Sequence, residues 1–254
     1  GHFLSSNSTN MHSFQQGNEY FIFSFDRTFN DKSNFFKPKF WQTQKRIIGT
    51  AKGRGTTYFL QTEDYLGVNC ALRHYYRGGL WGKFNKDRYY FSSLKKTRSF
   101  AEFYLLQRLY ESGLPVPKPI AARVQKGKFG ICYQADILTE KIENAQDLSL
   151  LLQATPLPKE IWTQIGKLIR QLHDQQVCHT DLNVHNILVQ QIKNRKQCWL
   201  LDFDKCTIRS GDSWKTDNLN RLHRSFTKEI KRMKIQFTKQ NWADLIEAYN
   251  QPQE

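Results

Sequence analysis

The sequence has no apolar run that approaches the ~20 residues needed to span a bilayer. Its first residues are polar and lack the apolar core of a signal peptide. Paired cysteines are also missing, because the five cysteines are scattered, odd in number and without a C-x-x-C pair. This argues against a disulfide framework and against a zinc site, and it favours a reducing compartment. We find no internal repeat and no low-complexity segment.

Acidic residues are scarce, with 23 Asp and Glu against 38 Lys and Arg, for a net charge of +15. A protein this basic is expected to meet an acidic partner, which leaves nucleic acid, an anionic membrane surface, or a phosphorylated or carboxylated substrate. The charge alone does not choose among them. With 254 residues and 39% hydrophobic content, the chain is long and apolar enough to fold as one large domain or two packed lobes.

The order of the expected elements divides the chain into two parts. We expect residues 1–10, which precede Met11, to be an expression remnant, with a native polar arm as the alternative. The fold class that follows is α+β, with a strand-rich N-lobe over 11–140, a helical C-lobe over 141–254 and a boundary near 138–144. The expected strands are 19–25, 46–51, 56–61, 68–75, 121–125, 130–138, 187–189 and 198–201, and the expected helices are 99–111, one that starts at Pro158, 217–233 and 242–249.

The clearest chemical signal is His179-Thr-Asp-Leu-Asn-Val-His-Asn186, followed by Leu200-Leu-Asp-Phe-Asp204. Phosphoryl transfer needs the acceptor hydroxyl positioned and the phosphate charge neutralised by metal, with little covalent help from the protein. An Asp at a loop tip can orient a hydroxyl and accept its proton. An Asn and a second Asp at neighbouring strand ends can hold Mg²⁺ against a triphosphate.

These motifs resemble those of the protein-kinase-like superfamily. The resemblance implies a two-lobe kinase fold, with Asp181 as the base, Asn186 as a metal ligand and Asp202 as the principal metal ligand. Asp204 stands where the superfamily has a glycine, which adds a further carboxylate to the expected metal ligands and removes a flexible hinge. The activation-segment switch of regulated protein kinases is therefore not expected. We assign no catalytic role to His179, expected to be packed in the loop.

The N-terminal half supplies the expected nucleotide-binding residues. Glycines at Gly53 and Gly55 would let backbone N–H groups approach phosphates, although a glycine-rich hairpin is often only a turn. By the same resemblance, Arg73 takes the place of the phosphate-binding lysine, with Lys83 as the competing cation. Glu102, in the following helix, is the expected partner carboxylate.

The adenine-binding hinge is expected at Glu140-Lys-Ile142, where the backbone of Glu140 and Ile142 would serve whatever the side chains are. The expected cofactors are ATP and Mg²⁺.

A closer resemblance is to the lipopolysaccharide core kinases of Gram-negative bacteria, the 3-deoxy-D-manno-octulosonic acid (Kdo) kinase family. It is carried by the catalytic motifs above together with Leu72-Arg-His-Tyr-Tyr-Arg-Gly-Gly-Leu80, the proline run Leu114–Pro119 and Asn218-Leu-Asn-Arg-Leu222. It implies transfer of the ATP γ-phosphate to the 4-hydroxyl of Kdo on a lipid A precursor. The partners would be that precursor and the anionic inner membrane, at its cytoplasmic face, with no nucleic acid.

Two segments are candidates for membrane contact. The segment Phe35-Phe-Lys-Pro-Lys-Phe-Trp41 mixes aromatics with cations, and we expect it to meet the membrane. In the helix near 221–233, one face carries cations and the other is apolar, and packing of the apolar face into the C-lobe is at least as good an interpretation. Arg77, Lys83 and Arg88 are candidates for contacts with acceptor phosphates or the Kdo carboxylate.

Three other functions are consistent with parts of this pattern. An aminoglycoside or choline kinase would phosphorylate a cationic acceptor, which the basic charge disfavours. A Ser/Thr or Tyr protein kinase would need an A-P-E anchor, which the segment after Asp202 lacks. A basic nucleic-acid-binding pseudokinase would be free to lose Asp181, Asn186 and Asp202, all of which are present.

Overall fold

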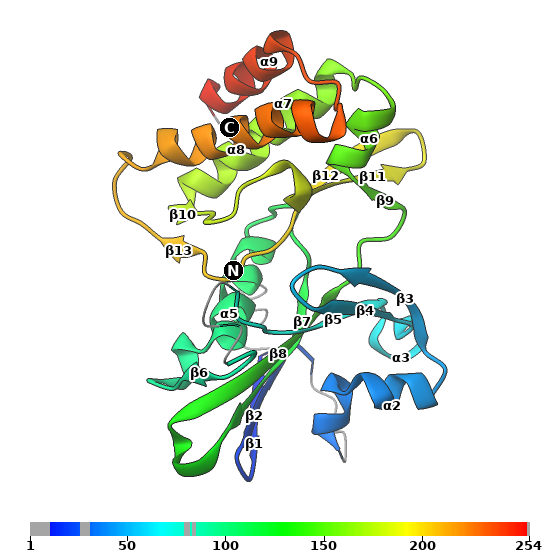
Figure 1. The fold of residues 1–254 in the computed structure, drawn as a ribbon, viewed down its shortest axis with the longest axis vertical. Helices are drawn as coiled ribbons and strands as arrows, with labels where there is room; N and C mark the ends of the chain where they lie inside the picture. Colours follow the sequence, from blue (N-terminus) through cyan, green and yellow to red (C-terminus); the bar gives the residue numbers. More distant parts are fainter. Residues whose placement is uncertain (1–10, 26–30, 79–81, 83–84, 253–254) are drawn as a thin grey trace, which may run out of the picture. The chain divides into compact units, whose positions relative to one another are not determined.

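The computed structural model describes residues 11–25, 31–78, 82 and 85–252. The chain folds into two compact units (Figure 1). The first contains the described residues up to Arg108 together with Lys118–Lys141, and the second contains Leu109–Pro117 and the described residues from Ile142 onward. The segment 109–117 belongs to the second unit, where the Leu200 N–H donates to the Pro115 carbonyl over 3.0 Å.

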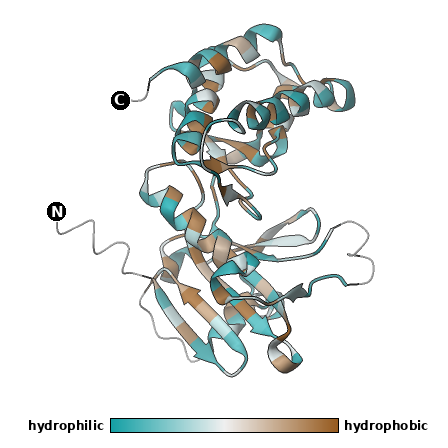
Figure 2. Cartoon of the chain, turned by 90° about the vertical axis from the view of Figure 1, so that its left-hand side faces the viewer, coloured by the Kyte–Doolittle hydropathy of each residue, from teal (hydrophilic) through white to brown (hydrophobic). Residues whose placement is uncertain are grey.

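The first unit is built on an antiparallel sheet of eight strands in the order β1-β2-β7-β8-β5-β4-β3, with β6 paired to β8. Consecutive residues of its central strands β2, β7 and β8 are buried, so both faces of the sheet are covered there, and Figure 2 shows hydrophobic residues on these strands. The strands are β1 (His12–Gln16), β2 (Glu19–Phe23), β3 (Ile47–Lys52), β4 (Thr56–Leu60), β5 (Cys70–His74), β6 (Tyr89–Tyr90), β7 (Pro119–Lys126) and β8 (Cys132–Glu140).

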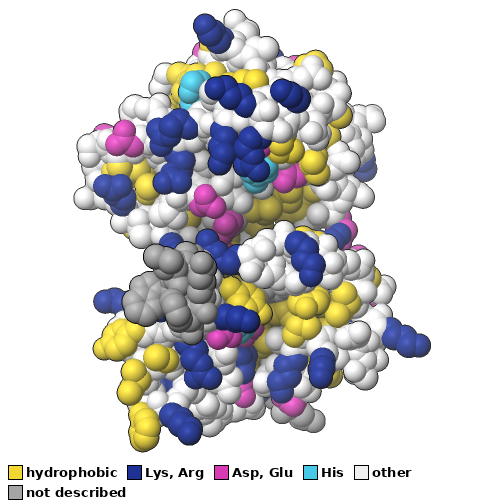
Figure 3. Space-filling model, in the orientation of Figure 1, with side chains coloured by type: hydrophobic (Ala, Val, Ile, Leu, Met, Phe, Trp, Pro, Cys, Tyr) yellow, Lys and Arg dark blue, Asp and Glu magenta, His cyan; other side chains and the backbone are white. Residues whose placement is uncertain are grey.

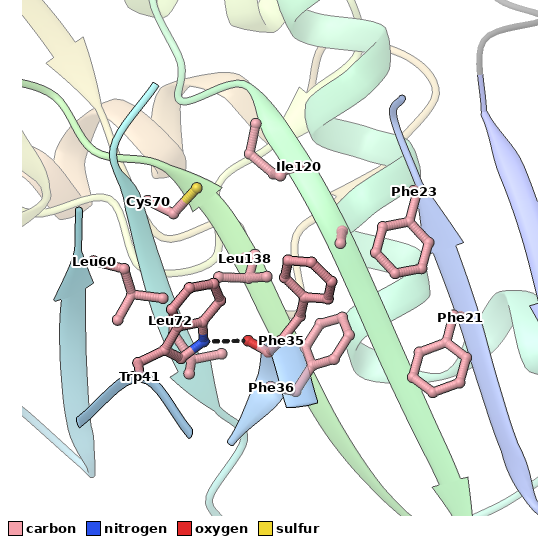
Figure 4. Packing of buried hydrophobic residues seen from close by; sticks show 11 residues of the cluster. Phe21, Phe23, Phe35, Phe36, Trp41, Leu60, Cys70, Leu72, Ile120 and Leu138 are labelled. Carbon is pink, nitrogen blue, oxygen red and sulfur yellow. Dashed lines mark hydrogen bonds between the residues drawn. The ribbon is translucent and has the colours of Figure 1, made fainter. Parts of the chain in front are cut away.

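The aromatic segment at 35–41 lies in the core of the first unit, so its expected membrane contact is wrong. It forms η1 (Lys32–Phe36) and α2 (Pro38–Thr43), and Phe35, Phe36 and Trp41 are all at most 5% exposed. The Trp41 indole N–H donates to the Phe35 carbonyl over 2.8 Å, which satisfies the one polar atom of the ring inside the cluster (Figure 4). These rings pack against side chains of the sheet.

The remaining elements of the first unit are short except for one helix. This helix, α5 (Arg98–Glu111), whose residues from Leu109 onward belong to the second unit, begins one residue before the predicted range and is followed by Gly113, whose φ of +85° suits glycine. The others are α3 (Glu63–Leu66), η2 (Leu94–Lys96) and η3 (Lys128–Gly130).

The second unit is mainly helical. Its two small sheets have the orders β12-β11-β9 and β10-β13. Its helices are α6 (Leu148–Ala154), α7 (Lys159–Asp174), η4 (Val184–Asn186), α8 (Lys215–Met233) and α9 (Lys239–Asn250), and its strands are β9 (Ala145–Asp147), β10 (Val177–Cys178), β11 (Ile187–Ile192), β12 (Arg195–Leu200) and β13 (Thr207–Ile208).

The helix α7 forms the centre of the second unit. Its repeating apolar residues are buried, as the period of 3.6 predicts, and Trp162 meets Phe226 of α8 edge to face at 5.4 Å. On another side α7 approaches α9 so closely that a side chain at Gly166 would lie 2.2 Å from the Leu245 carbonyl oxygen. Within the described ranges, no helix is long and apolar enough to cross a membrane.

Candidate active site

The loop that carries the strongest sequence motif runs from β10 to β11 in the second unit. It closes with η4, whose N-cap residue Asn183 accepts the His185 N–H over 2.8 Å, and the following strand pairs Ile187 with Leu200 of β12. The predicted placement of Asn186 and Asp202 at neighbouring strand ends is therefore present. The Leu201 N–H donates to the Asn186 carbonyl over 2.8 Å, which fixes the two ends together.

Asp181 lies exposed at the tip of this loop, with its carboxylate held by two amides. Asn183 Nδ2 donates to Asp181 Oδ1 over 2.9 Å. Asn186 Nδ2 donates to the Asp181 carbonyl over 2.7 Å and lies 3.4 Å from Asp181 Oδ2. The carboxylate is thus oriented by neutral donors and keeps its acceptor capacity, as a base for a hydroxyl requires.

Asp202 and Asp204 follow β12 in a tight turn beside the loop. Asp202 has a φ of +65°, in the left-handed region that Asp tolerates better than most residues, and its side chain is exposed. Between them Phe203 is buried against the His179 ring at 5.0 Å. Thr180 Oγ1 donates to the Asp204 carbonyl over 3.5 Å, so the two segments lie side by side.

His179 is fully buried, as expected, and its ring holds the backbone of the loop in place through hydrogen bonds. Its Nε2–H donates to the Leu201 carbonyl over 2.9 Å, and its Nδ1 accepts the Asp181 N–H over 3.1 Å. Burial lowers the pKa of His179, so the ring stays neutral and keeps this donor–acceptor arrangement. One imidazole thereby ties the backbone of Asp181 to the strand end that leads to Asp202.

A second layer of buried neutral groups supports His179. Asn218 of α8 donates Nδ2–H to the His179 carbonyl over 2.7 Å and accepts the His179 N–H over 3.3 Å. His173 of α7 donates Nε2–H to Asn218 Oδ1 over 2.9 Å, and the Tyr249 hydroxyl donates to His173 Nδ1 over 2.6 Å. Burial lowers the pKa of His173 to about 4. A chain of hydrogen bonds thus runs from α9 to the tip of the loop.

The oxygen atoms around Asp181 suit a hard divalent cation. Among the residues that the structure describes, no three His, Cys, Asp or Glu side chains form a group that could hold a metal by themselves. Mg²⁺ needs no such group, because it is commonly held by one or two carboxylates together with waters and substrate phosphates. The Asn186 amide nitrogen is engaged by Asp181, so its oxygen remains for a cation, together with the Asp202 carboxylate.

In the first unit, β5 and α5 hold the predicted ion pair. Arg73 NH2 lies 2.8 Å from Glu102 Oε2, and the Tyr75 hydroxyl donates to Glu102 Oε1 over 2.5 Å. Glu102 is buried, whereas the Arg73 side chain is 31% exposed. The pairing of Arg73 with Glu102 is confirmed, and the role of this cation in phosphate binding stays a prediction. Lys83, the competing cation, lies outside the described residues.

The opposite face of β5 carries a charged network. His74 lies 2.6 Å from Asp136 and 2.8 Å from Asp87, and Arg123 bonds Asp136 over 2.9 Å and Glu19 over 2.7 Å. Burial alone would lower the pKa of His74, but the two carboxylates outweigh burial and raise it. The protonated form of His74 is thereby favoured, and its two contacts connect Asp87 to Asp136 of β8.

The glycine-rich turn between β3 and β4 has a packing reason for one of its glycines. A side chain at Gly55 would lie 2.4 Å from the Tyr76 ring, and glycine avoids this clash. The turn itself is closed by a hydrogen bond of 2.9 Å from the Gly53 N–H to the Gly55 carbonyl. The turn thus fits the interpretation as a hairpin, and its contact with phosphates stays a prediction.

At the expected hinge, Glu140 is held by Lys118. The Glu140 N–H donates to the Lys118 carbonyl over 2.8 Å, and its side chain accepts the Lys118 N–H over 3.2 Å. The contact of the Glu140 and Ile142 backbone with an adenine base stays a prediction.

Sequence reasoning did not assign roles to Asn218, His173 and Asn183. Asn183 is visible in the loop motif, and its spacing of two residues from Asp181 is the signal that could have identified it. The other two come from α8 and α7, far away in the sequence, and only the fold shows that they meet His179.

Comparisons with known proteins identify the class of protein. The structure is similar to that of WaaP in complex with acyl carrier protein, with a TM-score of 0.56, 14% identity and coverage of 88% of each chain. With the strand-rich and helix-rich units, this likeness confirms the predicted α+β, protein-kinase-like fold.

The sequence defines the family. It is 75% identical over 241 residues to a 3-deoxy-D-manno-octulosonic acid kinase of Haemophilus influenzae (strain PittGG), and this match covers 95% of this chain and 100% of the relative. It is 63% identical over 235 residues to the kinase of that name from Mannheimia succiniciproducens, covering 92% and 98%. Residues 38–249 match the Lipopolysaccharide kinase (Kdo/WaaP) family. The chain belongs to this family and is a phosphotransferase of the ATP-dependent kinase type.

Proposed function

We propose that the protein transfers the γ-phosphoryl group of ATP to the 4-hydroxyl of a Kdo residue on a lipid A precursor, in the synthesis of the lipopolysaccharide core. The relatives' name supports the sugar acceptor, because identity of 75% extends over nearly the whole chain. The observation that carries the chemistry is the exposed Asp181 carboxylate on a loop held by buried neutral hydrogen bonds.

In this reaction Asp181 accepts the proton of the attacking hydroxyl. Its carboxylate is oriented by Asn183, so the hydroxyl meets an acceptor whose direction is set before the substrate arrives. Asn186 and Asp202 would hold Mg²⁺, with Asp204 as a further carboxylate in the same turn. When bound, the metal neutralises charge on the triphosphate. Arg73, held by Glu102, contributes a fixed cation for phosphate oxygens, and the Ile142 backbone would receive the base.

The acceptor surface follows from the distribution of charge on α8. This helix carries six Lys and Arg against two acidic residues, and Figure 3 shows Lys and Arg side chains gathered on a face of the second unit. Successive helix residues are ~100° apart, which places Arg221 and Lys228 towards the flank where Ser225 bonds the Val184 N–H. Arg224 and Lys231 lie further round the helix, beside Asn220 and Thr227, and Arg221 and Lys228 are the two cations that this geometry assigns to the acceptor.

This surface suits an anionic acceptor. Arg221 and Lys228 are exposed and form no ion pair with the described residues, unlike Arg232, which lies 3.2 Å from Glu229. The Kdo carboxylate and the phosphates of lipid A have the matching sign, whereas an aminoglycoside or choline would be repelled. The same charge would attract the protein to the anionic cytoplasmic face of the inner membrane, where we place it as a peripheral protein.

The test is direct. We would incubate the protein with Mg²⁺, ATP and a Kdo-bearing lipid A precursor and follow the mass of the lipid, with Asp181→Asn as the control variant. The expected result is a gain of one phosphate, lost in the variant. An unchanged lipid, with ATP still consumed in the presence of another sugar acceptor, would keep the kinase and reject the acceptor.

A further inference from the structure

Three large hydrophobic side chains are exposed together at one end of the first unit's sheet. Phe129 in η3 is 94% exposed, Tyr90 in β6 is 74% exposed and Ile131 is 55% exposed. Tyr90 pairs with Cys132, and the Phe91 N–H donates to the Ile131 carbonyl over 2.8 Å, so these residues adjoin one another. Figure 3 shows hydrophobic side chains gathered at this end, at the lower left of the view. We call Tyr90, Phe129 and Ile131 the hairpin tip.

Phe129 also has an unfavourable backbone conformation. Its φ of +62° lies in the left-handed region, which a bulky residue adopts only at a cost in free energy. The neighbouring glycines, Gly127 and Gly130, do not occupy this position. A glycine or asparagine would satisfy this turn with less strain. The ring contributes nothing to the core of the unit, since it is almost fully exposed. A reason for an aromatic residue here must therefore come from outside the described chain.

The surroundings of the hairpin tip are strongly basic. Residues 85–96 and 125–135 contain one carboxylate, Asp87, which is engaged by His74 and Gln134. The Arg88 guanidinium lies against Gly127, and Lys126 Nζ lies 3.9 Å from the centre of the Phe91 ring. The Lys and Arg residues of the two segments are Lys86, Arg88, Lys95, Lys96, Lys126 and Lys128.

We propose that the hairpin tip inserts its hydrophobic side chains into the interfacial layer of an anionic bilayer, with the surrounding cations at the headgroups. Aromatic and aliphatic side chains bordered by Lys and Arg have the composition of an interfacial contact. The charge selects a lipid surface of negative sign over a neutral apolar partner. The inference rests on the proposed function, because a lipid-linked acceptor requires the enzyme to work at a membrane, and it assigns that contact to residues that sequence analysis did not single out.

The experiment compares vesicle binding by matched variants of the full chain. Phe129→Asn removes the ring and leaves a residue that tolerates the left-handed backbone, so the fold should keep its thermal stability. We expect it to bind phosphatidylglycerol-containing vesicles roughly tenfold more weakly, the lower end of what burial of a Phe side chain contributes. Ile131→Gln should weaken binding less. Leu150→Gln, which replaces an aliphatic residue of α6 with 56% exposure, is the matched control and should bind as the unchanged protein does.

Two further measurements separate this inference from the proposed function. Phe129→Asn should phosphorylate a water-soluble Kdo glycoside at the normal rate, whereas Asp181→Asn should bind vesicles normally and fail to phosphorylate. Equal vesicle binding by the unchanged protein and Phe129→Asn would overturn the proposal, whatever the kinase assay gives. So would a concentration-dependent self-association that Phe129→Asn abolishes while vesicles are not bound, since the tip would then meet a second copy of the chain.

Discussion

The two units hold their functional residues in different ways. In the first unit, carboxylates are buried and paired, as in Glu102 with Arg73 and in Asp136 with His74 and Arg123. In the second unit, His179 and Asn218, which hold the backbone of the loop, are buried and neutral, and the carboxylates of Asp181 and Asp202 face solvent. The second unit also has a buried and paired carboxylate, Glu229, which lies 3.6 Å from His185 and 3.2 Å from Arg232. Paired buried charges fix side chains relative to one another, whereas neutral hydrogen bonds fix a backbone and leave the exposed charges for a ligand.

If this contrast is right, the largest effect on rate comes from an exposed carboxylate of the second unit. Asp181→Asn keeps the shape but loses the base, and general-base assistance contributes ~10²–10⁴-fold. We expect a rate loss of that size, with ATP binding and thermal stability kept. Asp202→Asn should also weaken Mg²⁺-dependent ATP binding, which calorimetry with and without Mg²⁺ measures. Near-normal turnover by Asp181→Asn would show that another group takes the proton.

The neutral support of the loop should make the protein sensitive to acid. Burial lowers the pKa of His173 from 6.5 to about 4, so the unfolded chain binds a proton at a higher pH than the folded protein does. The contribution to stability is complete above pH 6.5 and is lost as pH falls towards 4, by roughly 3 kcal/mol. Urea unfolding across this range measures the loss.

His173→Phe gives the control for this pH dependence. The variant cannot titrate at this position, so its unfolding free energy should vary less across the same range, although it starts lower because Asn218 and Tyr249 lose a partner. A profile as steep as that of the unchanged protein would assign the acid sensitivity to other groups.

Removing either partner of the buried ion pair should have unequal effects. Arg73→Ala leaves the Glu102 carboxylate buried with Tyr75 as a donor, and we expect the unfolding free energy to fall by roughly 2 kcal/mol. Glu102→Gln leaves a partly exposed Arg73 that water can solvate, and the loss should be about 1 kcal/mol. Chemical denaturation gives both values. If Glu102→Gln lost more unfolding free energy than Arg73→Ala, the unpaired buried charge of Glu102 would not be the cause of the loss.

In the kinase assay, a smaller effect than that of Asp181→Asn is expected from the exposed cations of α8. Arg221→Gln with Lys228→Gln should raise the KM for the lipid acceptor roughly thirtyfold, at ~1 kcal/mol for each cation near an anionic surface, and leave the KM for ATP unchanged. Lys159→Gln with Lys239→Gln removes the same charge from exposed positions on α7 and α9 and should change little. If both double variants raised the KM for the lipid acceptor equally, the effect would come from the net charge of the protein and not from the position of Arg221 and Lys228.

The sequence was sufficient to predict that Asn186 and Asp202 lie at neighbouring strand ends and that Arg73 pairs with Glu102, whereas the catalytic role of Asp181 stays a prediction. It was misleading for 35–41, where aromatic and basic residues have the composition of a membrane contact but Trp41 and its neighbours fill the core. The tip around Phe129 has similar composition and is exposed. Composition does not distinguish them, because exposure depends on which strands lie behind each segment.

Two kinds of structure were missed for different reasons. The strand β1 (His12–Gln16) is polar and lies at the edge of the sheet, so neither hydrophobicity nor alternation marks it. Asn218 belongs to a motif that supported the family, but its partners His173 and His179 come from distant parts of the chain. Such contacts are a product of the fold and carry no local signature.

The hydrogen bonds from Tyr249 to His173, Asn218 and His179 make the last turn of α9 a remote support of the catalytic loop. Arg170 adds a bond to the Tyr249 carbonyl over 2.8 Å. A truncation that removes Tyr249 is therefore expected to loosen the support of this loop and to lower activity, although the sequence of the loop itself is unchanged.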